Sequence, residues 1–195
     1  MELCFATNNK GKLAEIKHLL SDQYTILSLQ DIGCHEELEE TQPTIEGNSL
    51  QKASYVYEKY KINCFADDTG LEVNALNGAP GVISARYAGP DCSPEDNMNL
   101  LLKNLEGKTD RTATFKTVIT LIINGQSYAF TGFVDGIILN EKRGAKGFGY
   151  DPIFQPNGFS KTFAEMSMDE KNPISHRGRA VAKLTAFLKE QVNPE

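Results

Sequence analysis

Residues 111–133 read RTATFKTVITLII, then NG, then QSYAFTGF. Thr, Val, Ile and aromatic residues dominate both flanks, and these side chains favour extended strands. Asn124-Gly125 supplies two residues that tolerate a positive φ, as a tight turn between paired strands requires. The segment therefore predicts a long β-hairpin, with one strand over residues 111–123 and its partner over residues 126–133.

Strands and helices alternate through the rest of the chain. Apolar residues either run together over a few positions or recur at helical spacing, as Leu13, Ile16 and Leu20 do. Ser93-Pro94 is typical of a helix start, and Gly107 is a plausible stop for that helix. The expected strands cover residues 2–6, 24–29 and 62–66, and the expected helices follow residue 12, run through 53–60, extend from Pro94 toward Gly107 and begin near Ser175. Helix-linked strands combined with a long hairpin favour an α/β protein whose sheet is mixed.

The composition fits one domain over residues 1–195. A chain of 195 residues with 40% hydrophobic content can bury a core as one domain or two closely joined lobes. Its net charge of -6 argues against a nucleic acid polymer as partner, because a polyanion needs a basic surface. The charge is uneven, with acids concentrated in residues 31–46 and bases in residues 161–183, so small phosphates remain candidate ligands. No leader and no membrane-length apolar run is present, which favours a cytoplasmic protein without a membrane partner.

The four cysteines do not form a metal-binding pattern. Cys4, Cys34, Cys64 and Cys92 lie far apart, without a C-x-x-C pair. We therefore expect reduced and mostly buried thiols, and a zinc site is a much weaker hypothesis than simple packing.

Residues 7–12, TNNKGK, form the first candidate site. They lie between an expected strand and an expected helix, where backbone N–H groups can hold an anion. Thr7 and Asn9 would add hydrogen bonds, and Lys10 and Lys12 would add charge. The spacing is not that of a Walker loop, and the alternative of a solvated basic turn stays open.

The second candidate site is the acidic pair Asp67-Asp68. Both follow an apolar strand and precede an expected turn at Thr69-Gly70. With Glu40 they could bind Mg²⁺, or one of them could deprotonate a water for attack at phosphorus. A turn stabilised by aspartate side chains is an equally good interpretation of this segment by itself.

Two further segments predict a purine pocket. Residues 147–152, GFGYDP, place aromatic rings on a glycine-rich turn, and residues 175–179, SHRGR, open a helix with clustered donors. An aromatic face can stack on a base, and His or Arg can donate to a base carbonyl or a phosphate. Taken separately, these residues are better explained as core aromatic side chains beside a turn and as polar side chains at the start of a helix.

The motifs gain specificity from their order along the chain. They are residues 6–12, Glu39-Glu40-Thr41, Asn48 with Lys52-Ala53, residues 66–71, residues 78–81 with 84–87, residues 147–154, and Glu170-Lys171 with Ser175-His176-Arg177. In this order they resemble the inosine triphosphate pyrophosphatase family, also called the Ham1-like family. The resemblance covers roughly residues 2–188.

The resemblance implies an elongated α/β fold with two lobes flanking a central cleft, as in ITPase and Maf-like proteins, and a homodimer. It also implies Mg²⁺-dependent hydrolysis of ITP, dITP and XTP to the monophosphate and pyrophosphate, which removes deaminated purines from the nucleotide pool. Asp68 would be the base, Glu40 and Asp68 the metal ligands, and Lys12 a further catalytic residue. The substrate contacts would be Thr7, Asn8, Asn9, Lys10, Gly11, Lys12, Thr69, Phe148, Gly149, Tyr150, Asp151, Lys171, His176 and Arg177.

Some positions depart from the family pattern. Asn8 replaces a usual glycine, which is tolerable because Asn adopts a left-handed backbone more readily than most residues. Thr69 replaces a usual serine, and Gln42 and Gly47 replace a Gly and a Glu near the acidic segment, so Glu40 is a weaker assignment than Asp68. Two alternatives stay open: a nucleotide sensor without turnover, and a Maf-like pyrophosphatase for modified pyrimidine nucleotides.

Overall fold

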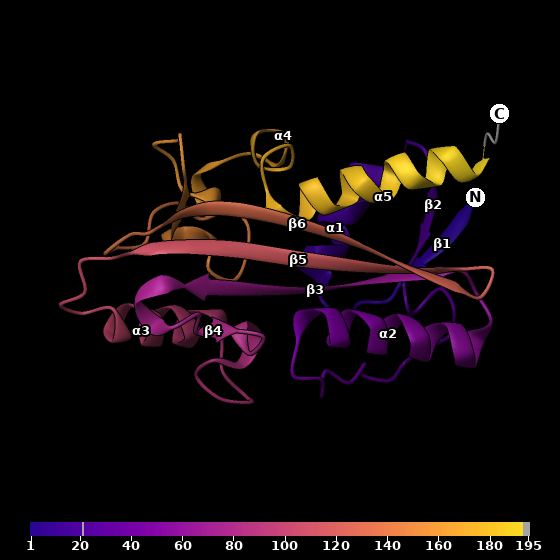
Figure 1. Cartoon of the computed structure of the whole chain (residues 1–195), viewed down its shortest axis with the longest axis horizontal. Coiled ribbons are helices and arrows are strands. Elements are labelled where there is room, and N and C mark those ends of the chain that lie inside the picture. The colour runs from indigo at the N-terminus through magenta and orange to yellow at the C-terminus, as the bar shows by residue number, and fades with distance from the viewer. Residues whose placement is uncertain (21, 193–195) are drawn as a thin grey trace. The chain divides into compact units, whose positions relative to one another are not determined.

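The computed structural model describes residues 1–20 and 22–192, without the side chains of residues 191 and 192 (Figure 1). The strands are β1 Glu2–Phe5, β2 Thr25–Leu27, β3 Cys64–Val73, β4 Pro80–Gly81, β5 Thr112–Ile123, β6 Gln126–Ile138 and β7 Phe154–Pro156. The helices are α1 Lys10–Leu20, α2 Ile45–Tyr60, α3 Pro94–Asn104, α4 Met168–Lys171 and α5 His176–Val192, with short 3₁₀ turns such as Asp151–Ile153.

The chain forms two compact units. Unit 1 contains residues 1–68, 117–132 and 177–195, and unit 2 contains residues 69–116 and 133–176. The strand order is β2-β1-β3-β5-β6-β7, with β4 paired to β3. β1 runs parallel to β2 and β3, whereas β4 runs antiparallel to β3 and β7 antiparallel to β6. The predicted mixed α/β sheet is therefore confirmed.

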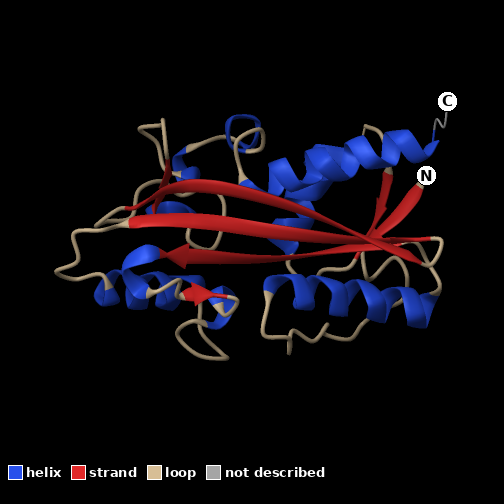
Figure 2. Ribbon diagram, viewed as in Figure 1, coloured by secondary structure: helices blue, strands red, loops and turns tan. Residues whose placement is uncertain are grey.

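Unit 1 has apolar layers on both faces of its strands. Side chains alternate between the faces of a strand, so Leu3 and Phe5 point one way while Cys4 and Ala6 point the other. The first pair packs with α1 and α5, in a cluster that includes Ile16 and Leu184, and the second pair packs with α2. Figure 2 shows these helices on opposite sides of the strands. Because such strands are buried on both faces, their sequences are nearly continuous runs of apolar residues.

Unit 2 has one main core. Leu71, Phe115 and Ile138 from its strands pack with Leu101 of α3 and with residues of the 150–166 segment. Ser93 caps α3 and forms a reciprocal pair of hydrogen bonds with Asp96, with Pro94 at the first helical position, as the sequence predicts.

The hairpin is also confirmed. Two residues, Asn124 at φ 52° and Gly125 at φ 80°, separate β5 from β6, and positive φ at both positions matches the turn expected for Asn-Gly. Cys4, Cys34, Cys64 and Cys92 are free thiols, and the first three are buried, as predicted. Among the described residues, no helix has both the length and the apolar character needed to cross a membrane.

One prediction about the acidic pair was wrong. Asp67 and Asp68 do not follow a strand, because β3 continues from Cys64 to Val73 and includes Thr69-Gly70. The expected turn at these residues is absent. The acids instead lie in the middle of an extended strand, where consecutive side chains face opposite sides of the sheet.

Candidate active site

The alternation of β3 separates the two aspartates of unit 1. Asp67 lies on the face covered by α1 and α5, where it contacts Lys12 and Arg177. Asp68 lies on the face covered by α2, where it contacts Asn48 and Lys52. Two neighbouring carboxylates therefore have different direct contacts.

Asp67 lies at the centre of a buried ion network. Its Oδ1 is 3.1 Å from Nζ of Lys12, and its Oδ2 is 3.1 Å from both Nε and Nη2 of Arg177. Arg177 also donates from Nη1 to Glu15 of α1. The side chains of Asp67 and Arg177 are 0% and 2% exposed, so these charges depend on one another for solvation.

Opposite effects act on the pKa of Asp67. Burial alone would raise it, but the positive charges of Lys12, Arg177 and Lys52 overcome that effect and hold the pKa below the ordinary value of 3.8. For Lys12 the balance is reversed: burial lowers the pKa of its ammonium, and the attraction of Asp67 opposes this only in part. The surrounding charges consequently favour the ionised form of Asp67.

Asp68 has the opposite shift. Burial raises its pKa above 3.8, and the attraction of Lys52 and Lys12 does not cancel that effect. Its Oδ2 accepts from Nδ2 of Asn48 at 3.2 Å, while Oδ1 of Asn48 accepts from the backbone N–H of Gln42 at 2.8 Å. Asn48 therefore ties Asp68 to the segment that follows Glu40. A carboxylate with a raised pKa is a better proton acceptor.

Glu40 and Asp68 converge on one cation. Nζ of Lys52 donates to Glu40 and lies 3.8 Å from Oδ1 of Asp68. Within the described residues, no group of three or more His, Cys, Asp and Glu side chains is arranged to hold a metal. Mg²⁺ in phosphate-processing sites commonly uses one or two carboxylates plus substrate oxygens. Two carboxylates already directed at one positive charge fit that requirement.

Residues 7–12 are not all in a loop, because α1 already begins at Lys10. Asn9 caps α1: its Oδ1 accepts from the N–H of Lys12 at 3.1 Å, and its carbonyl accepts from Leu13. Oδ1 of Asn9 is thus occupied by the cap. The N–H groups of Lys10 and Gly11, in the first turn, donate no hydrogen bond within the described part of the chain. Such amides at a helix N-terminus form an anion site.

The backbone of Asn8 is not left-handed, although the glycine that this residue replaces suggested that conformation. Among the described non-glycine residues, only Lys61, Asn77 and Asn124 have positive φ. The Asn8 amide instead donates to the carbonyl of Glu36 at 3.3 Å and accepts from the N–H of Leu38 at 3.0 Å. Asn8 therefore fixes the acidic segment that leads to Glu40.

Unit 2 contains a second polar group, centred on Asp151. This buried carboxylate accepts from Nζ of Lys171 at 2.7 Å and from the N–H of Phe148 at 3.0 Å. The Lys171 ammonium lies 5.2 Å from the ring centre of Phe148 and 5.3 Å from that of Phe163, within cation–π range. Four of the residues assigned to the base pocket, Phe148, Gly149, Asp151 and Lys171, come together here.

Gly147 makes this arrangement possible. Its φ is +72°, and a Cβ atom at this position would lie 2.1 Å from Oδ2 of Asp151. A side chain would therefore displace the carboxylate that anchors Phe148. Gly149 also has a positive φ, of 62°, so both glycines are required by the backbone of this turn.

The remaining residues predicted to contact the substrate each have other interaction partners. Tyr150 is buried in the unit 2 core and donates to the carbonyl of Ser84 at 2.8 Å, which favours the packing interpretation. The His176 ring stacks on Phe115 with centroids 4.5 Å apart. Arg177 belongs to the ion network around Asp67. Thr7 and Thr69 are half-buried, and Thr7 accepts from the N–H of Asn9.

Three residues of the site were missed as site residues by sequence reasoning. Asn48 and Lys52 lie four positions apart in α2, which places both on the face that meets Asp68. This four-residue spacing could have identified both residues as members of the site from the sequence. Glu15 is 4% exposed and pairs with Arg177, which is far away in sequence, so no local pattern marked it.

Known protein families and solved structures include clear relatives of this chain. A sequence profile described as the Ham1 family matches residues 3–187. The chain belongs to the Ham1 family. Family members named dITP/XTP pyrophosphatase include one from Flavobacterium johnsoniae, 57% identical over 96% of this chain and 98% of the relative, and one from Porphyromonas gingivalis, 50% identical over 96% and 97%.

Solved Ham1 structures share the fold. The Ham1 protein of Staphylococcus aureus superposes with a TM-score of 0.87 at 40% identity, covering 98% of this chain and all of that one. A HAM1 protein from Coxiella burnetii gives a TM-score of 0.88 at 38% identity, covering 97% and 99%. The Ham1 fold is thus shared along nearly the whole chain.

Proposed function

We propose that the protein hydrolyses ITP, dITP and XTP to the monophosphate and pyrophosphate, and so removes deaminated purines from the nucleotide pool. The observation that carries this proposal is the division of charge at β3: Asp67 is held ionised between Lys12 and Arg177, while Asp68 has a raised pKa. Adjacent acids with separated pKa values are typical of sites that combine charge stabilisation with proton transfer. Relatives named dITP/XTP pyrophosphatase support the substrate class.

In this proposal unit 1 performs the chemistry on the phosphates. The free N–H groups of Lys10 and Gly11 and the Lys12 ammonium bind the triphosphate, with Thr7 and Asn8 shaping the start of the helix. Asp68 accepts a proton from the water that attacks phosphorus. Asp67 does not act as the base, because its charge is committed to Lys12 and Arg177. Glu15 and Arg177 are positioning residues that keep Asp67 directed at Lys12.

Glu40 and Asp68 would hold the Mg²⁺ ion, with the remaining ligands coming from phosphate and water. When bound, Mg²⁺ supplies positive charge that stabilises the departing pyrophosphate. Lys52 already contacts both carboxylates, and the ammonium would keep the pair from repelling one another before the ion arrives. Dialysis against a chelator should abolish pyrophosphate release, and added Mg²⁺ should restore it.

Unit 2 would select the base. The Phe148 ring offers a stacking face, and Asp151 fixes this ring by accepting the N–H of Phe148. Lys171 and His176 supply donors for the 6-keto oxygen of hypoxanthine or xanthine, and adenine offers an amino group there instead. We further propose that both units work as a single pyrophosphatase domain, and that the protein is a cytoplasmic homodimer.

One assay separates this proposal from its alternatives. The protein is incubated with Mg²⁺ and, separately, ITP, dITP, XTP, dUTP, GTP or ATP, and pyrophosphate release is measured. We expect release from ITP, dITP and XTP well above that from ATP. Binding of ITP without release would favour a nucleotide sensor, and preference for dUTP would favour a Maf-like enzyme; either result would reject the proposal.

A further inference from the structure

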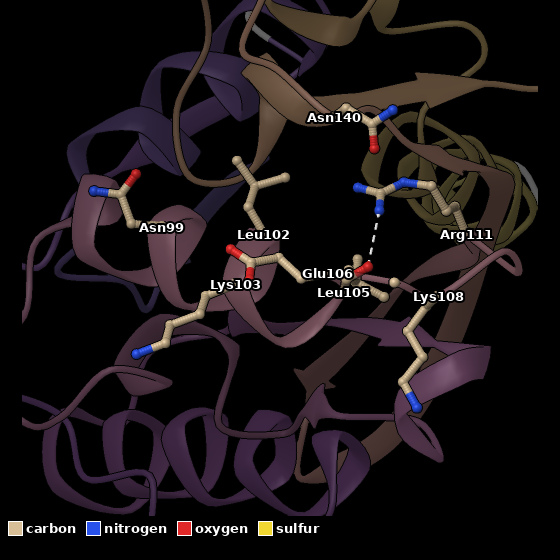
Figure 3. Close-up of a pocket in the computed structure, with 9 residues that line it drawn as sticks. Asn99, Leu102, Lys103, Leu105, Glu106, Lys108, Arg111 and Asn140 are labelled. Carbon is tan, nitrogen blue, oxygen red and sulfur yellow. Dashed lines mark hydrogen bonds between the residues drawn. The ribbon is translucent and has the colours of Figure 1, made fainter.

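A cavity of about 460 Å³ lies in unit 2, outside both groups of residues described above. It is formed by the end of α3, the segment that follows it and the residues beyond β6 (Figure 3). Cavities of this size accommodate small ligands. The residues that line it include Lys103, Glu106, Gly107, Lys108, Arg111 and Asn140.

Arg111 is held rigidly at this cavity. Its Nε donates to the carbonyl of Ile138 at 2.6 Å, Nη2 to Leu139 at 2.8 Å and Nη1 to Leu105 at 3.3 Å. These bonds use three of the five N–H groups of a guanidinium, so two remain. Figure 3 shows the guanidinium and the side chain of Asn140 extending into the same space. A fixed guanidinium fork is well suited to bind an oxyanion.

The positive charge at the cavity is not balanced by ion pairs. Within the described part of the chain, Lys103, Lys108 and Arg111 contact no carboxylate, and Glu106 is the one acid among the lining residues. Three cations and one anion leave a net charge of two positive units. The C-terminus of α3 offsets only about half a unit of charge. Arg111 caps this helix through Leu105, but that role leaves most of the positive charge available.

The donors also favour phosphate over carboxylate. Gly107 lines the cavity, and its backbone N–H has no hydrogen-bond acceptor among the described residues. Two N–H groups of Arg111, the Asn140 amide and the Gly107 N–H are available at the cavity. Figure 3 shows the Lys103 and Lys108 side chains directed away from the guanidinium, and their flexible stems allow the ammonium groups to turn toward a bound anion. Together these groups offer more donors than a single carboxylate can accept. A phosphate dianion matches both the number of donors and the net charge.

We propose that this cavity is a second anion site, which binds a small phosphate, either free orthophosphate or the terminal phosphate of an ester. This proposal does not rest on the proposed catalytic function, since the lining residues are distinct from Asp67, Asp68 and Asp151 and from the residues described above as bonded to them.

The test is a residue-resolved NMR titration of the isotopically labelled protein at constant ionic strength. Orthophosphate, inosine monophosphate and malonate are added separately, each to about 10 mM, a range that detects millimolar affinity. We expect saturable shifts of the Gly107 and Lys108 amides and of the Arg111 Nε–H with one or both phosphate compounds. Shifts with orthophosphate identify a free anion, and shifts with inosine monophosphate alone identify an ester.

A matched pair of variants controls for net charge. Lys103→Ala/Lys108→Ala should weaken the affinity at these signals at least tenfold, because it removes two cations from the rim. Lys17→Ala/Lys189→Ala removes two exposed lysines from unit 1 and should leave the affinity unchanged. Any signals from phosphate bound near Lys10 and Gly11 remain separate because each residue is observed individually.

Three results would overturn the proposal: no saturable shift with either phosphate compound, equal affinity for malonate, or an affinity that the Lys103→Ala/Lys108→Ala variant retains. Both lysines are exposed, so these substitutions should preserve the fold. Arg111→Lys provides a second measurement: it keeps the charge but removes the fork, and should weaken phosphate binding if the variant remains folded by circular dichroism.

Discussion

The polar groups of the two units are built by different means. In unit 1, Asp67 is surrounded by Lys12 and Arg177, and the arrangement depends on charges that must be present together. In unit 2, the ion pair of Asp151 with Lys171 lies among aromatic rings and against a glycine backbone. The first arrangement controls protonation and charge, whereas the second controls shape. Substitutions in unit 1 should therefore alter turnover and folding, and those in unit 2 should alter substrate affinity.

The largest effect is expected for Asp68→Asn. The variant loses the proton acceptor, so kcat for pyrophosphate release from ITP should fall about a thousandfold or more. Affinity for ITP should change far less, because unit 2 is untouched. The measurements are steady-state kinetics and calorimetric titration of ITP. Glu39→Gln, an exposed acid nearby, is the control, and near-normal kcat in Asp68→Asn would reject this residue as the base.

Asp67→Asn should mainly affect stability. It leaves the buried charges of Lys12 and Arg177 without their shared partner, which should cost roughly 3 kcal/mol or more of the free energy of unfolding. Urea unfolding measures this loss, and Asp91→Asn at an exposed position is the control. A loss below 1 kcal/mol, within the range of about 0–1 kcal/mol for surface ion pairs, would mean that the network contributes little.

The stability of the wild type and that of the Asp67→Asn variant should depend differently on pH. Because the pKa of Asp67 is lower in the folded state than its ordinary value of 3.8, its stabilising contribution is complete above that value and is lost as the pH falls through the folded pKa. The stability gap between wild type and Asp67→Asn should stay constant from about pH 7 to pH 5 and shrink below 3.8. A gap that widens in acid would contradict the assigned shift.

Lys171→Met tests unit 2 directly. Removal of the ammonium leaves Asp151 without its ion-pair partner and loosens the position of Phe148, so KM for ITP should rise about tenfold or more, equivalent to about 1.4 kcal/mol. The value of kcat should change less. Lys161→Met is the matched control, since Lys161 pairs with Glu170 at an exposed position. An equal fall in kcat with unchanged KM would assign Lys171 to the chemistry instead.

The smallest effect is expected for Tyr150→Phe. The variant loses one hydrogen bond, to the carbonyl of Ser84, which should cost about 1 kcal/mol of stability. KM for ITP should not change if Tyr150 is a core residue. A clear rise in KM without loss of stability would return Tyr150 to the base pocket. Tyr128→Phe, at a half-buried position of β6, is the control.

Local sequence signals predicted most of the regular structure. The Asn124-Gly125 turn, the Ser93-Pro94 helix start and the alternating segments of unit 1 were all found where they were expected. Each depends on residues within a few positions of one another, such as a capping side chain or a turn that needs positive φ. The predicted strand ends before Asp67 because acids and glycine are unfavourable in strands. In the structure β3 continues through these residues, because burial in the sheet outweighs that preference.

The sequence by itself determined the family motifs, the hairpin and the residue types available for chemistry. Only the tertiary structure decided which charges meet. Arg177, a predicted substrate contact, pairs with Asp67, 110 positions away, and with Glu15. The physical reason is that burial makes every charge depend on a partner, and that partner is selected by the face of β3 on which each carboxylate lies. The sequence spacing of the aspartates could not reveal this, because alternation along an extended strand sends neighbours into opposite layers.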